Sequence, residues 1–262
     1  MVKNSKSILL LVLMVVLLVL ISSRMSPRQA LRPDKPSVTD DPLPSATPAV
    51  ETEAPPEATP EPTPNIREIL PGVNVKEWNL KLVNNTYVLA NTFAPDVVAV
   101  RDQQYFDTRA ADALETFLKA AESAGYTVCI RTGYRPFSTQ AYLFNGKASQ
   151  IQWGTNMTLM EAETKARKIV AYPGTSEHQL GLAADIMDNA DTGMVAEEVE
   201  NLPVLLWLKQ HCAEYGFILR YPKDKQEITG WYEPWHFRYV GEEAAKYIMD
   251  KGICLEEVIA MF

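Results

Sequence analysis

Residues 176–185 read Ser-Glu-His-Gln-Leu-Gly-Leu-Ala-Ala-Asp, and this stretch decides how the chain folds. Small residues fill its second half, a pattern typical of a loop that enters a buried strand, and we predict that strand over residues 182–187. Glycine and alanine at these positions would let the backbone approach a ligand closely. His178 would then lie in the loop and Asp185 on the strand.

A second motif, Glu-Pro-Trp-His at residues 233–236, supplies another of the three histidines in the chain. A catalytic zinc site takes three nitrogen or oxygen ligands and leaves one position open, and His178, Asp185 and His236 could supply such a set. Taken singly, each histidine is better explained as a hydrogen-bonded core or surface residue, and Asp185 as a cap or salt-bridge partner. The two motifs together favour one zinc ion.

Glu233 lies three residues before His236, close enough to reach the metal's surroundings if Pro234 bends the chain between them. A carboxylate beside a zinc ion can take a proton from water and pass it to a leaving amine. We therefore predict Glu233 as the general base. Without the other ligand motif, a solvated turn carboxylate would be the simpler interpretation.

Arg131 ends a predicted strand at residues 126–131 and Arg135 follows it, and strand ends often line functional sites. An arginine there could bind a terminal carboxylate through a bidentate fork or stabilise an oxyanion at the scissile carbonyl. Without the zinc motif, both would be ordinary surface charges. Weaker candidates for substrate contacts are Gln140, Thr175, Ser176 and Trp235.

Helical and strand patterns alternate irregularly from residue 69 to the end of the sequence. We predict helices at 108–125, 158–170, 203–215 and 242–250, and strands at 126–131, 182–187, 217–221 and 235–240. Thr158 and Glu161 form a possible capping box at the start of the second of these helices. The pattern predicts one α+β domain over residues 69–262, with a small antiparallel or mixed sheet flanked by helices.

The N-terminal quarter of the chain has a different composition. An uncharged apolar run at residues 7–23 predicts a transmembrane signal anchor with residues 1–6 in the cytoplasm, although a cleaved signal peptide is the alternative. Residues 24–68 are rich in Pro, Thr and Glu, which predicts a disordered, largely extended linker. The domain would then lie outside the cell, attached to the membrane.

Charge and cysteine content exclude other classes. The formal net charge is −8, and no basic run interleaved with aromatic residues favours nucleic acid as a partner. Cys129, Cys212 and Cys254 have no Cys-x-x-Cys spacing, so we expect buried small residues rather than a disulfide framework or a thiolate zinc site.

Ordered motifs over residues from about 128 to 241 resemble the VanY-type D-alanyl-D-alanine carboxypeptidases, a family of zinc peptidases. The motifs are Gly133-Tyr-Arg135 with Gln140 downstream, Ser176-x-His178-x-x-Gly181-x-Ala183-x-Asp185, Tyr215-Gly-Phe-Ile-Leu-Arg-Tyr-Pro222, Thr229-Gly230, and Glu233-Pro-Trp-His236-Phe-Arg-Tyr-Val-Gly241. Several ordered motifs in one chain rarely coincide by chance.

The resemblance implies a zinc site made of His178, Asp185 and His236, with Glu233 as catalytic base and Arg135 as the group that stabilises the oxyanion. It also implies the small α+β fold shared with the Hedgehog signalling domain. Its implied activity is removal of the terminal D-alanine from peptidoglycan stem peptides or precursors, which resembles a route to glycopeptide resistance. Many relatives have Ser where this chain has Pro136, so the resemblance assigns no substrate contact to that side chain.

Other functions remain open at the level of sequence. The same fold could act as an L,D-carboxypeptidase on tetrapeptide stems or as a peptidoglycan endopeptidase. A non-catalytic wall-binding module would be expected to lack the base or a ligand, and all four residues are present. A structural zinc site would more typically use four protein ligands.

Overall fold

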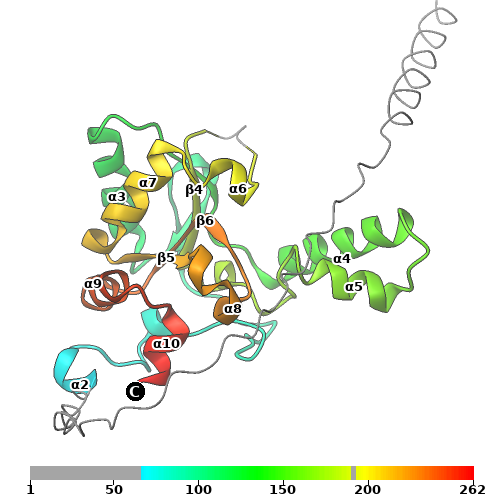
Figure 1. Ribbon diagram of the computed structural model, residues 1–262, viewed down its shortest axis with the longest axis horizontal. Coiled ribbons are helices and arrows are strands. Elements are labelled where there is room, and N and C mark those ends of the chain that lie inside the picture. Colours follow the sequence, from blue (N-terminus) through cyan, green and yellow to red (C-terminus); the bar gives the residue numbers. More distant parts are fainter. Residues whose placement is uncertain (1–65, 190–192) are drawn as a thin grey trace, which may run out of the picture. The chain divides into compact units, whose positions relative to one another are not determined.

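A four-stranded antiparallel sheet lies at the centre of the computed structural model, which describes residues 66–189 and 193–262 (Figure 1). Its strands run in the order β3 (Cys129–Thr132), β4 (Ala183–Met187), β6 (Glu233–Tyr239) and β5 (Phe217–Tyr221). All neighbouring strands are antiparallel. The two middle strands, which are distant in sequence, carry the predicted ligands Asp185 and His236.

Alternation along these strands gives the sheet two chemically different faces. Ile186, Phe217 and Phe237 belong to the large apolar core. Because successive side chains of a strand point to opposite faces, Asp185 and His236 lie on the other face. One face therefore stabilises the fold, and the other carries the polar groups of the site.

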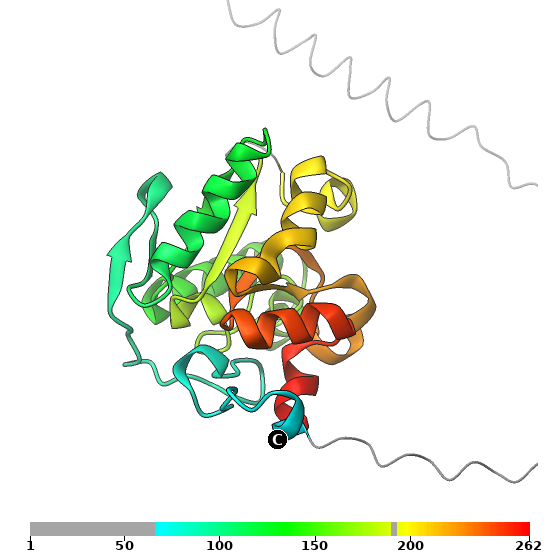
Figure 2. The ribbon, with the colours of Figure 1, turned by 90° about the vertical axis from the view of Figure 1, so that its left-hand side faces the viewer.

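Helices α3 (Ala111–Ser123) and α7 (Pro203–His211) pack against each other on the apolar face (Figures 1 and 2). Phe117, at the middle of α3, stacks on Phe217 with ring centroids 5.4 Å apart and meets Phe237 edge-on at 5.7 Å. Such aromatic pairs contribute about 0.5–1.5 kcal/mol each beyond their burial. The apolar side of α3 is therefore packed against the centre of the sheet.

A second apolar cluster forms where α9 (Glu242–Lys251) and α10 (Leu255–Ala260) pack beside Ile218 of β5. Ile218 points away from Phe217 and Leu219, as strand alternation requires. These two C-terminal helices cover the part of the polar face that lies along β5.

Helices α4 (Phe137–Trp153) and α5 (Leu159–Ala166) form a hairpin that projects from the sheet, on the right of Figure 1. Its small core includes Phe144, Ala148 and Ala166. The capping box predicted at the start of α5 is confirmed: the Glu161 amide donates to the Thr158 hydroxyl at 3.3 Å, and the Thr158 amide donates to the Glu161 carboxylate at 2.8 Å. Helix α4 was not predicted from the sequence.

Short elements complete the described part of the chain. They are α2 (Ile66–Ile69), η2 (Trp78–Leu80), β1 (Val97–Ala99), η3 (Arg101–Gln103), β2 (Tyr105–Asp107), η4 (Glu177–Leu180), α6 (Ala196–Val199), η5 (Cys212–Tyr215), η6 (Lys223–Lys225) and α8 (Gln226–Thr229). Strands β1 and β2 pair with each other in a separate antiparallel ribbon.

The predicted α+β class with a small sheet flanked by helices is confirmed. The strand predicted at 126–131 begins later, at Cys129, and the helix predicted at 203–215 ends at His211 and continues as the 3-10 turn η5. The helix predicted to reach about residue 170 ends at Ala166.

The predicted cytoplasmic N-terminus, anchor (7–23) and nearly all of the linker lie outside the described residues. The first described element, α2, begins within the last three residues of that predicted linker, and its Ile66 is buried. Within residues 66–189 and 193–262, no helix is long and apolar enough to cross a membrane.

Candidate metal centre and its cavity

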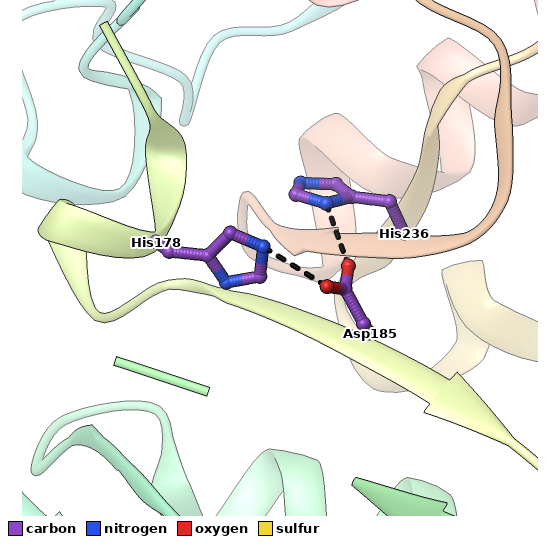
Figure 3. A group of neighbouring side chains, drawn as sticks. All are labelled: His178, Asp185 and His236. Atoms are coloured by element: carbon purple, nitrogen blue, oxygen red, sulfur yellow. Dashed lines mark hydrogen bonds and ion pairs between the residues drawn. The ribbon is translucent and has the colours of Figure 1, made fainter. Parts of the chain in front are cut away.

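Asp185 and His236 face each other because of strand register. They are directly paired residues on β4 and β6, and Asp185 Oδ1 lies 2.9 Å from His236 Nδ1 (Figure 3). His178 comes from the preceding turn η4, and its Nε2 lies 3.2 Å from Asp185 Oδ2. The structure thus brings together the three predicted ligands, with one carboxylate between two imidazole rings.

The turn that presents His178 depends on a left-handed glycine. Gly181 ends η4 with φ +71°, a conformation that side chains other than glycine rarely adopt, and a Cβ there would lie 3.2 Å from the Asp107 amide nitrogen. The Gly133 carbonyl accepts a hydrogen bond from His178 Nδ1 at 2.9 Å. That bond places the proton on Nδ1 and leaves Nε2 facing Asp185.

The donor set fits a divalent metal ion of the zinc type. His178, Asp185 and His236 are buried, and one ligand atom from each lies within 4.8 Å of the others. Burial opposes a charge on His236, but the carboxylates of Asp185 and Glu177 raise its pKa to about 9. Acidic groups that stabilise an imidazolium would also stabilise a bound cation, and two imidazoles with a carboxylate are common zinc ligands.

Glu233 lies at the edge of this cluster, at the start of β6. Its Oε2 is 3.5 Å from His236 Nδ1. Burial, together with the charge of Asp185, raises the pKa of the Glu233 carboxyl to about 7 against the opposing effect of His236. A carboxylate with such a pKa can both accept and release a proton near neutral pH.

Arg135 supplies a positive charge to the site, and no carboxylate of the described residues pairs with it directly. Its backbone amide donates to the His178 carbonyl at 3.0 Å, which ties Arg135 to the turn η4. Its guanidinium forms no salt bridge within 4.0 Å to any described residue, and its Nε is buried without a hydrogen-bond partner among them. Burial lowers the pKa of Arg135, while Asp185 and Glu233 oppose the shift.

One cavity of about 350 Å³ joins these groups. It is lined by the three predicted ligands, by Glu233 and Arg135, and by the predicted contacts Gln140, Thr175, Ser176 and Trp235. The buried Gln140 donates its Nε2 to the Ala171 carbonyl at 2.6 Å, while its Oε1 has no partner among the described residues. Gln140 therefore also supports the cavity wall.

Arg131, the other predicted substrate contact, is absent from the lining of this cavity. The adjacent Thr132, which pairs with Asp185 across β3 and β4, lines it instead. The pairing of β3 with β4 shifts register between Ile130 and Thr132, which brings Thr132 opposite Asp185 and gives Arg131 no paired residue on β4. The structure places Arg131 away from the site.

Some lining residues were not predicted from the sequence. Leu143, Lys147 and Gln150 come from α4, at helical spacing along one side of it. Tyr221 lies with its ring centroid 4.7 Å from that of His236. The i, i+4, i+7 spacing of these three α4 residues could have indicated that they share one side of a helix, but α4 itself was not predicted.

Comparison with known proteins agrees with this geometry. The family model of the VanY D-alanyl-D-alanine carboxypeptidase matches residues 103–242, just over half of the chain. A D-alanyl-D-alanine carboxypeptidase of Enterococcus faecalis is 39% identical over 185 residues, which cover 70% of this chain and 66% of that protein. The putative carboxypeptidase YodJ of Bacillus subtilis is 38% identical over 189 residues, covering 68% of this chain and 66% of its own length.

Solved structures with the same fold include two peptidases. A mutant of the D,D-pentapeptidase VanY from a VanB-type vancomycin resistance cassette, in complex with Zn(II), has a TM-score of 0.60 and 37% identity, covering 70% of this chain and 99% of its own. The L,D-carboxypeptidase LdcB has a TM-score of 0.59 and 37% identity, covering 69% and 85%. All charged side chains that line the cavity lie within residues 103–242, which the family model matches. The chain belongs to the VanY D-alanyl-D-alanine carboxypeptidase family.

Proposed function

We propose that this chain is a zinc-dependent D-alanyl-D-alanine carboxypeptidase that removes the terminal D-alanine from peptidoglycan stem peptides or their precursors. The observation that carries the proposal is the convergence of His178, Asp185, His236, Glu233 and Arg135 on one cavity. Membership of the VanY family and the Zn(II) complex of a structural neighbour support it.

In this proposal, His178, Asp185 and His236 hold the zinc ion. Bound zinc supplies Lewis-acid chemistry, activating a water molecule for attack and polarising the scissile carbonyl. Glu233 takes the proton from the attacking water and delivers it to the leaving amine, a transfer for which its raised pKa suits it.

Arg135 has two possible partners, the oxyanion that forms at the scissile carbonyl and the terminal carboxylate of the substrate. In the described part of the chain, no carboxylate lies within 4.0 Å of its guanidinium, which is partly desolvated. Binding either anion would therefore give this positive charge an ionic partner. We assign it to the oxyanion. The Arg135 backbone amide donates a hydrogen bond to the His178 carbonyl, so Arg135 is held next to the metal ligands.

A second candidate is L,D-carboxypeptidase activity on tetrapeptide stems. The specific observation in its favour is that the chain resembles LdcB as closely as it resembles the VanY pentapeptidase, with 37% identity to each. The two activities differ in the configuration of the residue before the scissile bond, which is recognised by contacts with the cavity wall.

The test follows D-alanine release by the full-length protein, purified in detergent and loaded with zinc. The substrates are a stem pentapeptide ending in D-Ala-D-Ala and the corresponding tetrapeptide, each with and without a chelator. Chelator-sensitive release from the pentapeptide supports the D,D activity, and release from the tetrapeptide alone supports the L,D activity. No release from either by a folded, zinc-loaded protein contradicts both.

We also propose that the domain is held outside the cell by a single membrane anchor. The basis is the apolar run at residues 7–23 and the Pro-rich segment that follows it. In cell fractionation, the full chain should sediment with membranes, and protease added to intact protoplasts should digest its C-terminal domain. Recovery of the uncleaved chain in the soluble fraction would contradict this arrangement.

A further inference from the structure

Glu177, the residue before His178, is a fully enclosed carboxylate that lines the cavity. Its Oε1 accepts hydrogen bonds from Arg220 Nε at 2.9 Å and from Arg238 Nη1 at 2.7 Å. Both arginines are themselves completely buried. Two charge-assisted bonds to one oxygen fix the carboxylate in a single orientation.

The second oxygen, Oε2, is directed at His236. It lies 3.7 Å from His236 Nε2, and neither atom has a hydrogen-bond partner among the described residues. A buried polar atom without a hydrogen-bond partner destabilises the folded state. A shift of under about 1 Å would bring the two atoms into the range of an N–H···O bond.

The two nitrogens of His236 therefore have different surroundings. Nδ1 faces Asp185 and Glu233 at the metal cluster, at 2.9 and 3.5 Å. Nε2 lies 3.7 Å from Glu177 Oε2. A neutral imidazole can offer a lone pair to a metal from one nitrogen only when the proton is on the other.

A buried frame of linked ion pairs, made of Glu177, Arg220, Arg238 and Glu256, holds the Glu177 side chain in this place. Arg220 of β5 also donates to both oxygens of Glu256 in α10, at 2.9 and 2.6 Å. Arg238 of β6 donates to the carbonyls of Asn79 and Lys81, at 2.9 Å each. The frame contains two carboxylates and two guanidinium groups, so its charges balance within the buried network.

We propose that Glu177 is a positioning residue for the metal centre: it accepts the Nε2 proton of His236 and so keeps the Nδ1 lone pair directed at the zinc ion. Arg220 and Arg238 aim the carboxylate. Outer carboxylates that accept from a metal-ligating histidine set its tautomer and ring orientation, and their loss typically lowers metal affinity 10–100-fold. The inference rests on the zinc site of the proposed function, but not on the peptidase reaction.

The test uses Glu177→Gln, which keeps the shape of the side chain. Arg220 and Arg238 donate hydrogen bonds, so the glutamine would turn its carbonyl oxygen towards them. Its NH₂ group would then face His236 Nε2 and could donate a hydrogen bond only to an unprotonated Nε2. His236 would then carry its proton on Nδ1, the wrong nitrogen for the metal. We expect zinc affinity of the full-length protein, measured by competition with a chelator, to fall by about 10–100-fold.

The matched control is Glu256→Gln, which removes the other carboxylate partner of Arg220 and leaves the Glu177–His236 contact in place. Both variants weaken the same buried frame and should lower the melting temperature of the metal-free protein. We expect zinc affinity to stay within about threefold of the wild type in Glu256→Gln. Equal losses of affinity in the two variants, or none in Glu177→Gln, would overturn the proposal.

A measurement on the wild type covers the case in which Glu177→Gln fails to fold. The chain has three histidines, so ¹⁵N-histidine labelling gives few imidazole signals. In the zinc-loaded protein we expect the remaining proton of His236 on Nε2. A proton on Nδ1, with Nε2 bound to zinc, would refute the role of Glu177 whether or not the protein hydrolyses D-Ala-D-Ala.

Discussion

Asp185 and His236 are paired across strands β4 and β6, with Asp185 Oδ1 2.9 Å from His236 Nδ1. Asp185 also contacts His178 through its other oxygen, so its carboxylate bridges the two imidazoles. The geometry of the metal centre is therefore a consequence of sheet register. A slip of one residue in either strand would move one of these side chains to the apolar face.

Asp185→Asn tests the importance of this carboxylate. The substitution keeps the size of the side chain but removes the charge, so we expect zinc affinity to fall by a factor of about 100 or more. A ligand that binds only the folded state raises the melting temperature. Chelation should therefore lower the melting temperature of the wild type and leave that of Asp185→Asn nearly unchanged. Equal responses of the two proteins would contradict the assignment.

Glu233→Ala separates catalysis from metal binding. Because Glu233 is at the edge of the cluster and is not needed to complete the ligand set, the variant should fold and retain one zinc ion per chain. We expect kcat for D-alanine release to fall by about 10²–10⁴, the usual contribution of general acid–base catalysis. Zinc content, measured by atomic absorption, is the control. Full turnover by a zinc-loaded Glu233→Ala protein would eliminate the proposed base.

Arg135 should contribute to activity while contributing little to stability. Its guanidinium is partly desolvated and has no salt bridge to any residue that the structure describes, so replacement by Ala removes an uncompensated charge. We expect Arg135→Ala to lower kcat/KM by about 10²–10³ without lowering the melting temperature. Arg135→Lys keeps the charge but loses the fork and should recover only part of the activity. A large loss of stability in Arg135→Ala would indicate a structural role instead.

The fold and the ligand set could be largely predicted because their signals are local. Strand β5 was predicted with the observed bounds, since Gly216, at φ +80°, ends the preceding turn and an apolar run follows it. His178, Asp185 and His236 were predicted together from the spacing of two motifs, and the family resemblance strengthened that interpretation. Helix α4 was missed because it buries only Gln140, Phe144 and Ala148, too few positions for a clear apolar stripe.

The buried ion network could not be predicted, because it depends on tertiary contacts. Arg220 and Arg238 lie in strands, where a sequence pattern would assign an arginine to the solvent-facing side. They are instead fully buried, because Glu177 comes from a distant turn to meet both. The same limit explains Arg131, whose place in one motif with Arg135 suggested a shared role, although Arg131 does not line the cavity.

Phe117→Ala tests the core on the apolar face. The side chain is fully buried between α3 and the sheet, so its removal should cost about 3–5 kcal/mol of unfolding free energy through lost burial and a residual cavity. The control is Tyr142→Ala, at a side chain of α4 that is 78% exposed, which should change stability by no more than about 0.5 kcal/mol. Urea unfolding measures both. Similar effects would mean that α3 is not packed as described.

The three cysteines provide a last prediction, which concerns burial throughout the domain. All three are free thiols; burial raises the pKa of Cys212 to about 12 and that of Cys254 to about 11, and also raises the pKa of the half-buried Cys129. Because the thiolate is the reactive form, iodoacetamide at pH 7.5 should label the native protein slowly, with Cys129 first and Cys212 last. In denaturant, all three should react at one rapid rate. Fast native labelling of Cys212 would show that the helix–sheet core opens readily.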